Sequence, residues 1–217
     1  VIAPSAFSDK TDLVTVSMPD TIQTIGAFAF SNCTNITDVK FSKNLSLCVL
    51  AAFQGCTSLE NVDMSMTQIT ELPNQMFYKC SSLKSVTLPE TCTSVGNYAF
   101  ANCPQLESVY IPASVTEIGP KVFRNSSAVT IKGVAGSYAE EYAKANNIPF
   151  SAVQTYEIGD VNMDGKIDIS DATCVQKIIA GIIKPTAQQS YLADYNQDGE
   201  VTVVDATDMQ KYIVNLV

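Results

Sequence analysis

Two short runs of oxygen-bearing side chains, offset by 34 residues, are the part of the sequence best suited to binding chemistry. The first is "DVNMDGKIDISD", residues 160–171, and the second is "DYNQDGEVTVVD", residues 194–205. Asp or Asn stands at positions 1, 3 and 5 of each run, and a Gly at position 6 allows the sharp turn that wraps the chain around an ion. Carboxylate and amide oxygens in this spacing are typical of calcium-binding loops, so the sequence predicts two bound Ca²⁺ ions.

The expected ligands follow the twelve-position EF-hand loop, in which position 7 contributes a main-chain carbonyl and position 9 acts through water. Position 12 is Asp here instead of the usual Glu. The predicted ligands are Asp160, Asn162, Asp164, Lys166, Asp168 and Asp171 in the first loop, and Asp194, Asn196, Asp198, Glu200, Thr202 and Asp205 in the second. At position 8, Ile167 and Val201 predict a short strand that pairs the loops. The alternative is an acidic, solvated turn, because Asp, Asn and Gly are common turn residues, but the second copy argues against chance.

Composition sets limits on the possible functions. The chain has 217 residues, 46% of them hydrophobic, which is enough for a substantial core in one or two domains. Its net charge of -9 argues against nucleic acid as a partner. Residues 1–150 hold 12 acids and 9 bases (-3) and residues 151–217 hold 10 acids and 4 bases (-6), so the acidity is concentrated around the calcium loops. No apolar run is long enough to span a membrane. Because the chain opens on "VIAPSAF", inside a repeat, we expect it to be a fragment of a longer protein.

A repeat of about 23 residues fills the first two thirds of the chain. It is marked by a column of phenylalanines, Phe7, Phe30, Phe53, Phe77, Phe100 and Phe123, spaced by 23, 23, 24, 23 and 23 residues. Each of the first five Phe is followed by apolar residues spaced i, i+3, i+5 and then by a second apolar pair, which predicts two inward-facing stretches per coil. A period of this length is typical of leucine-rich repeats, whose coils must stack to bury a shared core.

The polar residues beside the central Val of each apolar trio are candidates for ligand contact. They are Thr15 and Ser17, Asp38 and Lys40, Asn61 and Asp63, Ser85 and Thr87, and Ser108 and Tyr110. An ordinary solvated face is the alternative, because these side chains are mostly small and polar.

Four of the seven cysteines occupy one equivalent position, three residues after a Phe, in successive coils. They are Cys33, Cys56, Cys80 and Cys103. This regularity predicts a buried stack of thiols, with disulfides between coils or a soft-metal site as alternatives. No C-x-x-C spacing is present, which argues against zinc. Cys174, outside the repeat, is expected to be a core residue.

The stretch "TCTSVGNYAFANCPQLESVYIPASVTEIG" resembles the BspA-like leucine-rich repeats of bacterial surface proteins, and the resemblance covers residues 1–133. The segment "GSYAEEYAKANNIPF" breaks the period and predicts a helix over 136–147 that caps the last coil. We expect Tyr138, Tyr142 and Ala145 to face that coil, and Glu140 to pair with Lys144 on the other side. The predicted domains are therefore 1–150, a leucine-rich repeat domain with its capping helix, a linker at 151–158, and a second domain at 159–217.

The C-terminal segment is a duplicated unit of loop, helix, linker, loop and helix. The amphipathic helices that follow the two calcium loops are "DATCVQKIIAGII" and "DATDMQKYIVNLV". Two calcium loops that lack the preceding helix of an EF-hand resemble a dockerin domain. The resemblance implies calcium-dependent binding to a cohesin module of a scaffoldin, through loop positions 10 and 11 and the following helix. The residues it points to are Ile169, Ser170, Thr173, Gln176 and Lys177 in the first half, and Val203, Val204, Thr207, Gln210 and Lys211 in the second. The Ser-Thr pair of well-known type I dockerins is absent from positions 10 and 11, which leaves the cohesin class open.

The expected fold is thus a β-rich solenoid of about six 23-residue coils, followed by a small all-α dockerin with two EF-hand-like calcium loops. The resemblances imply a non-catalytic, secreted adaptor in a cell-surface complex of an anaerobic bacterium that degrades polysaccharide. The repeats would bind an unknown protein or carbohydrate ligand. The alternative is the C-terminal fragment of a larger dockerin-bearing hydrolase or peptidase, with the repeats as a spacer. Against catalysis within this chain, it has no His to act as a general base and no partner for a thiol nucleophile.

Overall fold

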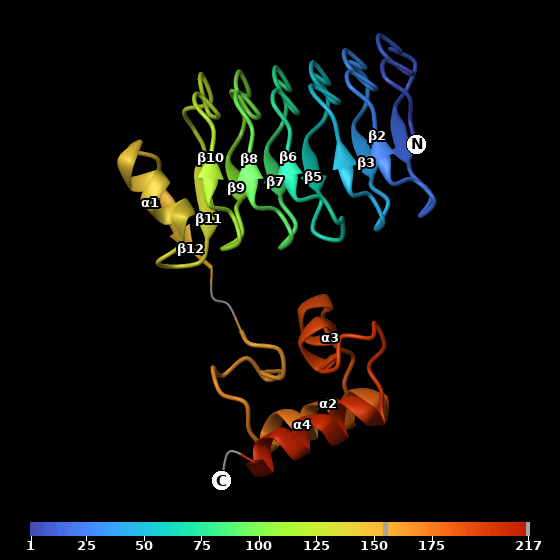
Figure 1. Ribbon diagram of the computed structural model, residues 1–217, viewed down its shortest axis with the longest axis vertical. Coiled ribbons are helices and arrows are strands. Elements are labelled where there is room, and N and C mark those ends of the chain that lie inside the picture. The colour runs from blue at the N-terminus through green and yellow to red at the C-terminus, as the bar shows by residue number, and fades with distance from the viewer. Residues whose placement is uncertain (154–155, 216–217) are drawn as a thin grey trace. The chain divides into compact units, whose positions relative to one another are not determined.

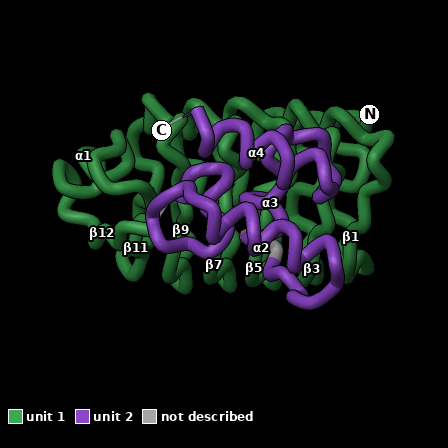
Figure 2. Tube along the Cα trace, turned by 90° about the horizontal axis from the view of Figure 1, so that it is seen from below, with its two compact units in different colours: residues 1–153 green, residues 154–217 purple. Residues whose placement is uncertain are grey.

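The chain divides after Val153 into two compact units, coloured green and purple in Figure 2. The computed structural model describes residues 1–153 and 156–215. Residues 154–155 of the expected linker and residues 216–217 of the expected second domain lie outside the described residues. Each unit has a hydrophobic core of its own.

The first unit is a solenoid of six coils, each contributing a short strand to a parallel row (Figure 1). The strands of this row are β1 (Thr15–Ser17), β3 (Asp38–Lys40), β5 (Asn61–Asp63), β7 (Ser85–Thr87), β9 (Ser108–Tyr110) and β11 (Thr130–Gly133). In β3 and β5 the central Val is buried and both neighbours are exposed, because successive side chains of a strand point to opposite faces. The apolar spacing in the sequence predicted this arrangement, and it is confirmed.

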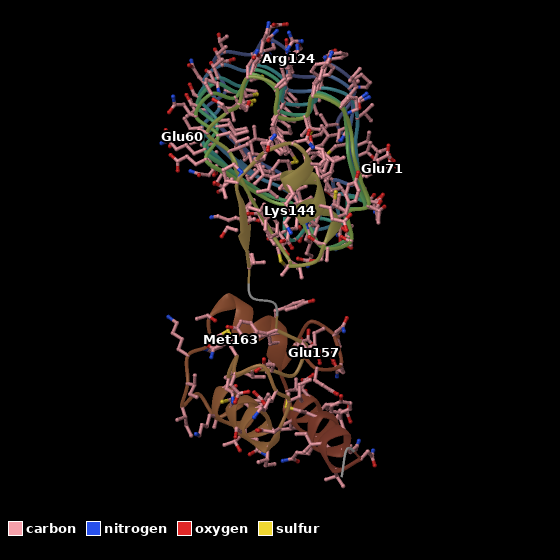
Figure 3. All side chains as sticks on the ribbon, turned by 90° about the vertical axis from the view of Figure 1, so that its left-hand side faces the viewer. Glu60, Glu71, Arg124, Lys144, Glu157 and Met163 are labelled. Carbon is pink, nitrogen blue, oxygen red and sulfur yellow. The ribbon has the colours of Figure 1, made fainter. Side chains whose placement is uncertain are left out.

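A second parallel row closes the other side of the coils. Its strands are β2 (Thr24–Ile25), β4 (Leu47–Cys48), β6 (Glu71–Leu72), β8 (Ser94–Val95) and β10 (Glu117–Ile118). Figure 3 shows Glu60, which precedes β5, and Glu71, the first residue of β6, projecting outward on opposite sides of the solenoid. Between the rows lies the core that the stacked coils share.

Both rows are interrupted at the same seam, between the second and third coils. Among the described residues β3 does not pair with β5, nor β4 with β6. In the second row, the N–H of Gly96 donates to the carbonyl of Leu72, but the equivalent residue one coil earlier is Pro73, which has no N–H. The third coil is also longer by one residue, with 24 residues from Phe53 to Phe77.

The repeated phenylalanines form a continuous stack through the core. Neighbouring ring centroids along the column lie 5.0 to 6.1 Å apart. Phe53, Phe77 and Phe100 are fully buried, whereas Phe7 in the first coil is 39% exposed. Stacked aromatic rings of this kind contribute both buried area and ring–ring attraction to the contact between coils.

The four regular cysteines are free and buried beside the phenylalanine column. Each S–H donates to the main-chain carbonyl of the Phe in the preceding coil, over 2.9 to 3.2 Å. In the last coil Ser126 takes the place of the Cys, and its hydroxyl donates to the carbonyl of Phe100 at 2.7 Å. The predicted stack of small buried side chains is confirmed, and it is a hydrogen-bonded stack.

The last coil is covered by α1 (Tyr138–Ala145) and by β12 (Phe150–Ala152), which pairs in parallel with β11. α1 turns Ala139 and Ala143 into the core, and the ring of Tyr142 lies 6.4 Å from that of Phe123. The predicted pair of Glu140 and Lys144 is confirmed at 2.8 Å.

The expected inner face of α1 is wrong in part. Tyr138 is 38% exposed and Ala145 is also exposed, whereas the fully buried positions are Ala139 and Ala143. Small side chains one helical turn apart let the helix backbone approach the coil closely, which bulky Tyr residues in their place would prevent. The sequence analysis also missed β12, so that Ser151 and Ala152, assigned to the linker, lie in a strand.

The second unit contains α2 (Ile169–Ile179), α3 (Ala187–Ala193) and α4 (Val203–Asn215). Its small core joins α2, α3 and α4 with the first loop, and consists of Val161, Ala172, Val175, Leu192, Ala193, Ala206 and Met209. Cys174 packs against this core, partly buried. None of the described helices is both long and apolar enough to cross a membrane.

Two local predictions for this unit are wrong. Ile167 and Val201 form no strand; both instead pack, partly buried, against the core. The segment between the two halves, expected to be a linker, contains α3. Its start was readable in the sequence, because Thr186 is followed three residues later by Gln189, which is the pattern of a capping box. In the structure the Thr186 side chain accepts the N–H of Gln189, and the Gln189 side chain accepts the N–H of Thr186.

Candidate functional site

The first loop is organised by the carboxylate of Asp160, which is buried. Its Oδ1 accepts the N–H of Asp164 at 3.0 Å and its Oδ2 accepts the N–H of Gly165 at 2.9 Å. Gly165 has φ of 87°, a conformation that side-chain-bearing residues rarely adopt, so the glycine permits the turn. Asn162 Oδ1 also accepts the N–H of Asp164, at 2.8 Å. Positions 1, 3 and 5 therefore converge on one turn.

The loop is closed by Asp171, in the first turn of α2. This side chain is fully buried, and its two oxygens accept the N–H groups of Asn162 at 2.9 Å and Asp168 at 3.0 Å. One carboxylate thus connects the start of the loop to its end. The same residue fixes α2 relative to the loop, because it belongs to the helix.

The second loop repeats these contacts. Asp194 accepts the N–H groups of Asp198 at 3.0 Å and Gly199 at 2.9 Å, and Gly199 has φ of 94°. Asp205, fully buried at the start of α4, accepts the N–H groups of Asn196 at 3.1 Å and Thr202 at 2.8 Å. The sequence duplication is therefore also a duplication of hydrogen bonds.

The loops differ at position 9. In the first, Asp168 Oδ1 accepts the N–H of Ser170 at 2.7 Å and caps α2, and this hydrogen bond lowers the pKa of Asp168. In the second, Thr202 Oγ1 accepts the N–H of Val204 at 3.2 Å. Burial acts to raise the pKa of Asp205, but the N–H groups of Thr202 and Asn196 outweigh it, so the pKa is lowered. Both groups are therefore carboxylates at neutral pH.

The side chains available in the loops fit a hard cation. The donors are carboxylate and amide oxygens with main-chain carbonyls beside them, a set that suits Ca²⁺ and lacks the thiolates or imidazoles that zinc prefers. Among the residues that the structure describes, no group of three or more Asp, Glu, Cys or His side chains is arranged so that it could hold a metal ion. The carboxylates here instead hold the loop main chain, and the Asn amides complete the donor set. The residues that would hold the two ions are the twelve predicted ligands, six in each loop, with Lys166 and Glu200 contributing only their main-chain carbonyls.

The ten residues expected to contact a cohesin lie on the outer faces of α2 and α4, and none of them is buried. Three are large exposed apolar side chains, Ile169 (60%), Val203 (66%) and Val204 (49%). Thr173 and Thr207 turn their hydroxyls back onto their own helices, donating to the carbonyls of residues 169 and 203.

One exposed residue of α4 was missed by the sequence analysis. Val214 is 72% exposed and lines a shallow hollow of about 360 Å³ with Thr207, Gln210, Lys211 and Asn215. The available signal was its spacing, seven residues after Thr207 and three after Lys211, which places it on the same helix face. The equivalent residue of the first half is Ala180, so the matching position has only a methyl side chain, and Ile179 beside it is 36% exposed.

On the solenoid, the candidate ligand-contacting residues flank the central Val of each strand, which is buried in β3, β5, β7 and β9 and partly buried in β1. Several are already paired with neighbours from adjacent coils or turns. Ser85 donates to Asn61 Oδ1 at 2.7 Å, and the hydroxyl of Tyr110 donates to Glu90 at 2.6 Å. Burial and this neighbouring carboxylate raise the pKa of Tyr110.

Family models match both units. The BspA type leucine rich repeat region matches in six copies over residues 1–130, and the dockerin type I domain matches residues 158–214. Both suspected resemblances are therefore confirmed, together with the fold class. The matched dockerin family is one whose members bind cohesin modules and calcium. No curated protein matches the chain.

Three of the solved structures with similarity are leucine-rich repeat proteins. A leucine rich cell surface protein from Faecalibacterium prausnitzii is 29% identical over 60% of this chain and 42% of its own, with a TM-score of 0.47. A leucine rich repeat protein from T. pallidum is 20% identical, over 69% of this chain and 78% of its own, with a TM-score of 0.48. One from Eubacterium ventriosum is 18% identical, over 54% and 38%, with a TM-score of 0.46. The chain thus spans less than half the length of the first of these structures.

The six repeat copies cover more than half of the chain, and the duplicated loop–helix unit follows them. The chain therefore belongs to the family of BspA type leucine-rich repeat proteins and carries a dockerin type I domain after the repeats.

Proposed function

We propose that the chain is a non-catalytic extracellular adaptor, in which the dockerin binds a cohesin module of a scaffoldin in a calcium-dependent way. The observation that carries this proposal is the duplicated hydrogen bonding of the two loops. In each loop the first Asp, Asp160 or Asp194, and the last Asp, Asp171 or Asp205, accept main-chain N–H groups of the loop. The last Asp also belongs to the first turn of the following helix. A cation held by these loops would fix α2 and α4, whose outer faces carry the residues expected to contact the cohesin. The solenoid would bind a separate protein or carbohydrate ligand.

Two features support a non-catalytic role. Both matched modules are binding modules, and the sequence contains no His. The acidic side chains of the coils are spread over the surface, and several are paired, as Glu60 is with Lys84 at 2.7 Å. A glycosidase would need two carboxylates held on either side of one bond, with the pKa of one raised.

A second candidate is a spacer, in which the repeats bind nothing and separate the dockerin from a further part of a larger hydrolase or peptidase. The observation in its favour is that polar side chains of the strand row satisfy one another, as in the pair of Ser85 and Asn61. Such a face has fewer free hydrogen-bonding groups to offer a ligand.

We also propose that the two compact units are independently folding domains, with the boundary after Val153. The dockerin and the BspA type repeats favour secretion into a cell-surface complex of an anaerobic bacterium, where the complex would act on polysaccharide. The pairing of β12 with β11, and the N–H of Val153 that donates to the carbonyl of Gly133 at 2.8 Å, support a linker that begins after residue 153.

The test is direct binding of the full chain to purified type I and type II cohesins, by calorimetry in excess calcium and in excess chelator. We expect binding to one class in calcium and at least a hundredfold weaker binding in chelator. The loop variant Asp160→Ala with Asp194→Ala should behave in calcium as the wild type does in chelator. Glu60→Ala, on the solenoid, is the matched control and should bind normally. Failure to bind either class, or equal binding with and without calcium, would refute the proposal.

A further inference from the structure

The two calcium loops hold their main chains by the same hydrogen bonds but differ at position 9, which is Asp168 in the first loop and Thr202 in the second. We infer that Asp168 makes the first loop the tighter calcium site, and that the second loop fills at a higher calcium concentration. This inference rests on the proposed calcium binding and concerns the order in which the two sites fill.

The first argument is the number of charged ligands. Among the side chains expected to act on the ion, the first loop has four carboxylates, from Asp160, Asp164, Asp168 and Asp171. The second has three, from Asp194, Asp198 and Asp205. Calcium affinity in loops of this kind rises with the number of charged ligands. Even through a bridging water, a carboxylate at position 9 attracts the ion, whereas the neutral Thr202 adds no charge.

The second argument is competition for the closing carboxylate. Asp205 Oδ2 accepts two hydrogen bonds, from the N–H of Thr202 at 2.8 Å and from the Thr202 hydroxyl at 3.3 Å. Asp171 Oδ2 accepts the N–H of Asp168 at 3.0 Å, and a position 9 Asp has no hydroxyl to add. The Thr202 hydroxyl therefore occupies a lone pair of Asp205 Oδ2 that an ion would use, whereas Asp168 has no such hydroxyl and adds a negative charge to its loop.

The third argument is burial of the first ligand. Asp160 is 1% exposed, whereas Asp194, its counterpart, is partly exposed. Less water screens a buried carboxylate, so its attraction for a cation is stronger once the ion is bound.

The charges at position 7 act in the opposite direction. Lys166 adds a positive side chain to the first loop and Glu200 a negative one to the second. Both side chains are exposed, and position 7 is expected to offer the ion its main-chain carbonyl only. Water and salt screen exposed charges, so position 9 outweighs position 7.

The order of filling bears on docking because the second loop leads directly into α4. Thr202 caps the N–H of Val204, and Val203 and Val204 are the first exposed residues of that helix. The ion that binds last is therefore the one beside these two valines, and its affinity sets the calcium concentration at which the start of α4 is fixed.

The test follows each site separately in the full chain, labelled with ¹⁵N-glycine. Only ten glycines give signals, and two of them, Gly165 and Gly199, donate their N–H to Asp160 and Asp194, each at 2.9 Å. In a calcium titration buffered with chelator, we expect the Gly165 signal to move at about tenfold lower free calcium than the Gly199 signal, as one additional charged ligand would give.

Exchange variants assign the cause. Asp168→Thr should shift the Gly165 midpoint to higher calcium, and Thr202→Asp should shift the Gly199 midpoint to lower calcium. The second variant adds a ligand, so the test stands even if the first variant fails to fold. The control Lys166→Glu with Glu200→Lys exchanges the position 7 charges, which oppose the order in the wild type, and should shift the two midpoints less than the position 9 variants do. The inference is overturned if Gly199 moves first or together with Gly165, or if the position 7 exchange shifts the midpoints more than the position 9 variants do. If neither glycine responds to calcium, the proposed calcium binding fails as well.

Discussion

The thiol of Cys103 donates a hydrogen bond to the main-chain carbonyl of Phe77, 26 residues earlier and one coil away, at 3.1 Å. That carbonyl also accepts the N–H of Cys80 within its own coil. The S–H bond therefore connects successive coils through the core, beside the stacked phenylalanine rings. Ser126 makes the same bond with a hydroxyl in the last coil, which indicates that this position requires a small side chain with a donor.

The first prediction concerns this donor. Cys103→Ser keeps a donor aimed at Phe77, so we expect a loss of about 1 kcal/mol or less in the free energy of unfolding. Cys103→Ala removes the donor and leaves a small cavity, and should cost about 2 kcal/mol. Urea unfolding of both variants at neutral pH measures the difference. Equal losses in the two variants would show that the hydrogen bond contributes nothing.

The second prediction is a loss of solenoid stability at alkaline pH. Burial raises the pKa of Cys48, Cys56 and Cys103 from 9.0 to about 12. Above pH 9 the unfolded chain releases these protons while the folded chain keeps them. The free energy of unfolding should therefore fall as pH rises from 9 towards 12, by up to about 1.4 kcal/mol per pH unit for each thiol.

Unfolding in urea at several pH values between 8 and 10.5 measures this slope. Lysine and tyrosine also titrate near the upper end, so the variant Cys56→Ser with Cys103→Ser is the control. It should have a shallower slope that is not flat, because burial also raises the pKa of Cys33, Cys80 and Cys92. A slope identical to that of the wild type would contradict the assignment.

The third prediction tests the cap. Ala143 is fully buried against the last coil, whereas Ala145, two residues later on the same helix, is exposed. Ala143→Arg forces a long charged side chain into a closely packed contact and should cost roughly 3 kcal/mol or more in the stability of the solenoid. Ala145→Arg should change it by less than about 0.5 kcal/mol. Thermal unfolding followed by circular dichroism compares the two. Similar effects would mean that α1 is not the cap.

These examples show which parts of the fold could be read from the sequence. The phenylalanine and cysteine columns recur at a fixed period, and periodicity specifies which side chains must be buried when coils stack, so the strand row and thiol stack were predicted. The face of α1 was not, because a single helix offers no repeat to average over. Tyr138 and Ala145 fit an apolar stripe as well as Ala139 and Ala143 do, and only contact with the coil decides between them.

The seam between the second and third coils depends on tertiary contacts in the same way. Pro73 could be seen to lack a donor, but the absence of pairing between β3 and β5 has no equally local cause. In the dockerin, the loop pattern identified Asp160 and Asp171 because their roles follow from position in the loop. The hydrogen bond between Thr202 and Asp205, which distinguishes the two loops, could be recognised only in the structure.

The fourth prediction is that calcium removal unfolds the dockerin and leaves the solenoid folded. The dockerin core is small, and without ions its loops hold several carboxylates close together. Excess chelator should therefore remove most of the helical circular dichroism signal of α2 and α4. The reactivity of Cys33, Cys56, Cys80 and Cys103 towards a thiol reagent should stay slow, since these thiols lie in the solenoid core. An unchanged helical signal, or rapid labelling of these four, would contradict the prediction.

The fifth prediction concerns which half of the dockerin docks. The two halves share Asp-Ala-Thr at 171–173 and 205–207 and Gln-Lys at 176–177 and 210–211, so either helix could present a similar face to one cohesin. The faces differ in their apolar content. α4 has Val203 and Val204 at one end and Val214, 72% exposed, at the other, whereas α2 has Ile169 beside Ser170 at one end and Ile179, 36% exposed, at the other. Exposed aliphatic side chains gain most from burial at an interface, so we expect both modes to exist and the α4 mode to dominate.

Paired substitutions measure this preference. Val203→Asp with Val204→Asp should weaken cohesin binding at least tenfold more than Ile169→Asp with Ser170→Asp, because the second pair leaves the dominant mode intact. Val214→Asp alone should weaken binding as well, and Ala180→Asp, at the equivalent site of α2, serves as its control. All four variants should keep their calcium-dependent helical signal, which separates a docking defect from misfolding. Equal losses from the two pairs would indicate two modes of similar strength, and a larger loss from the α2 pair would reverse the assignment.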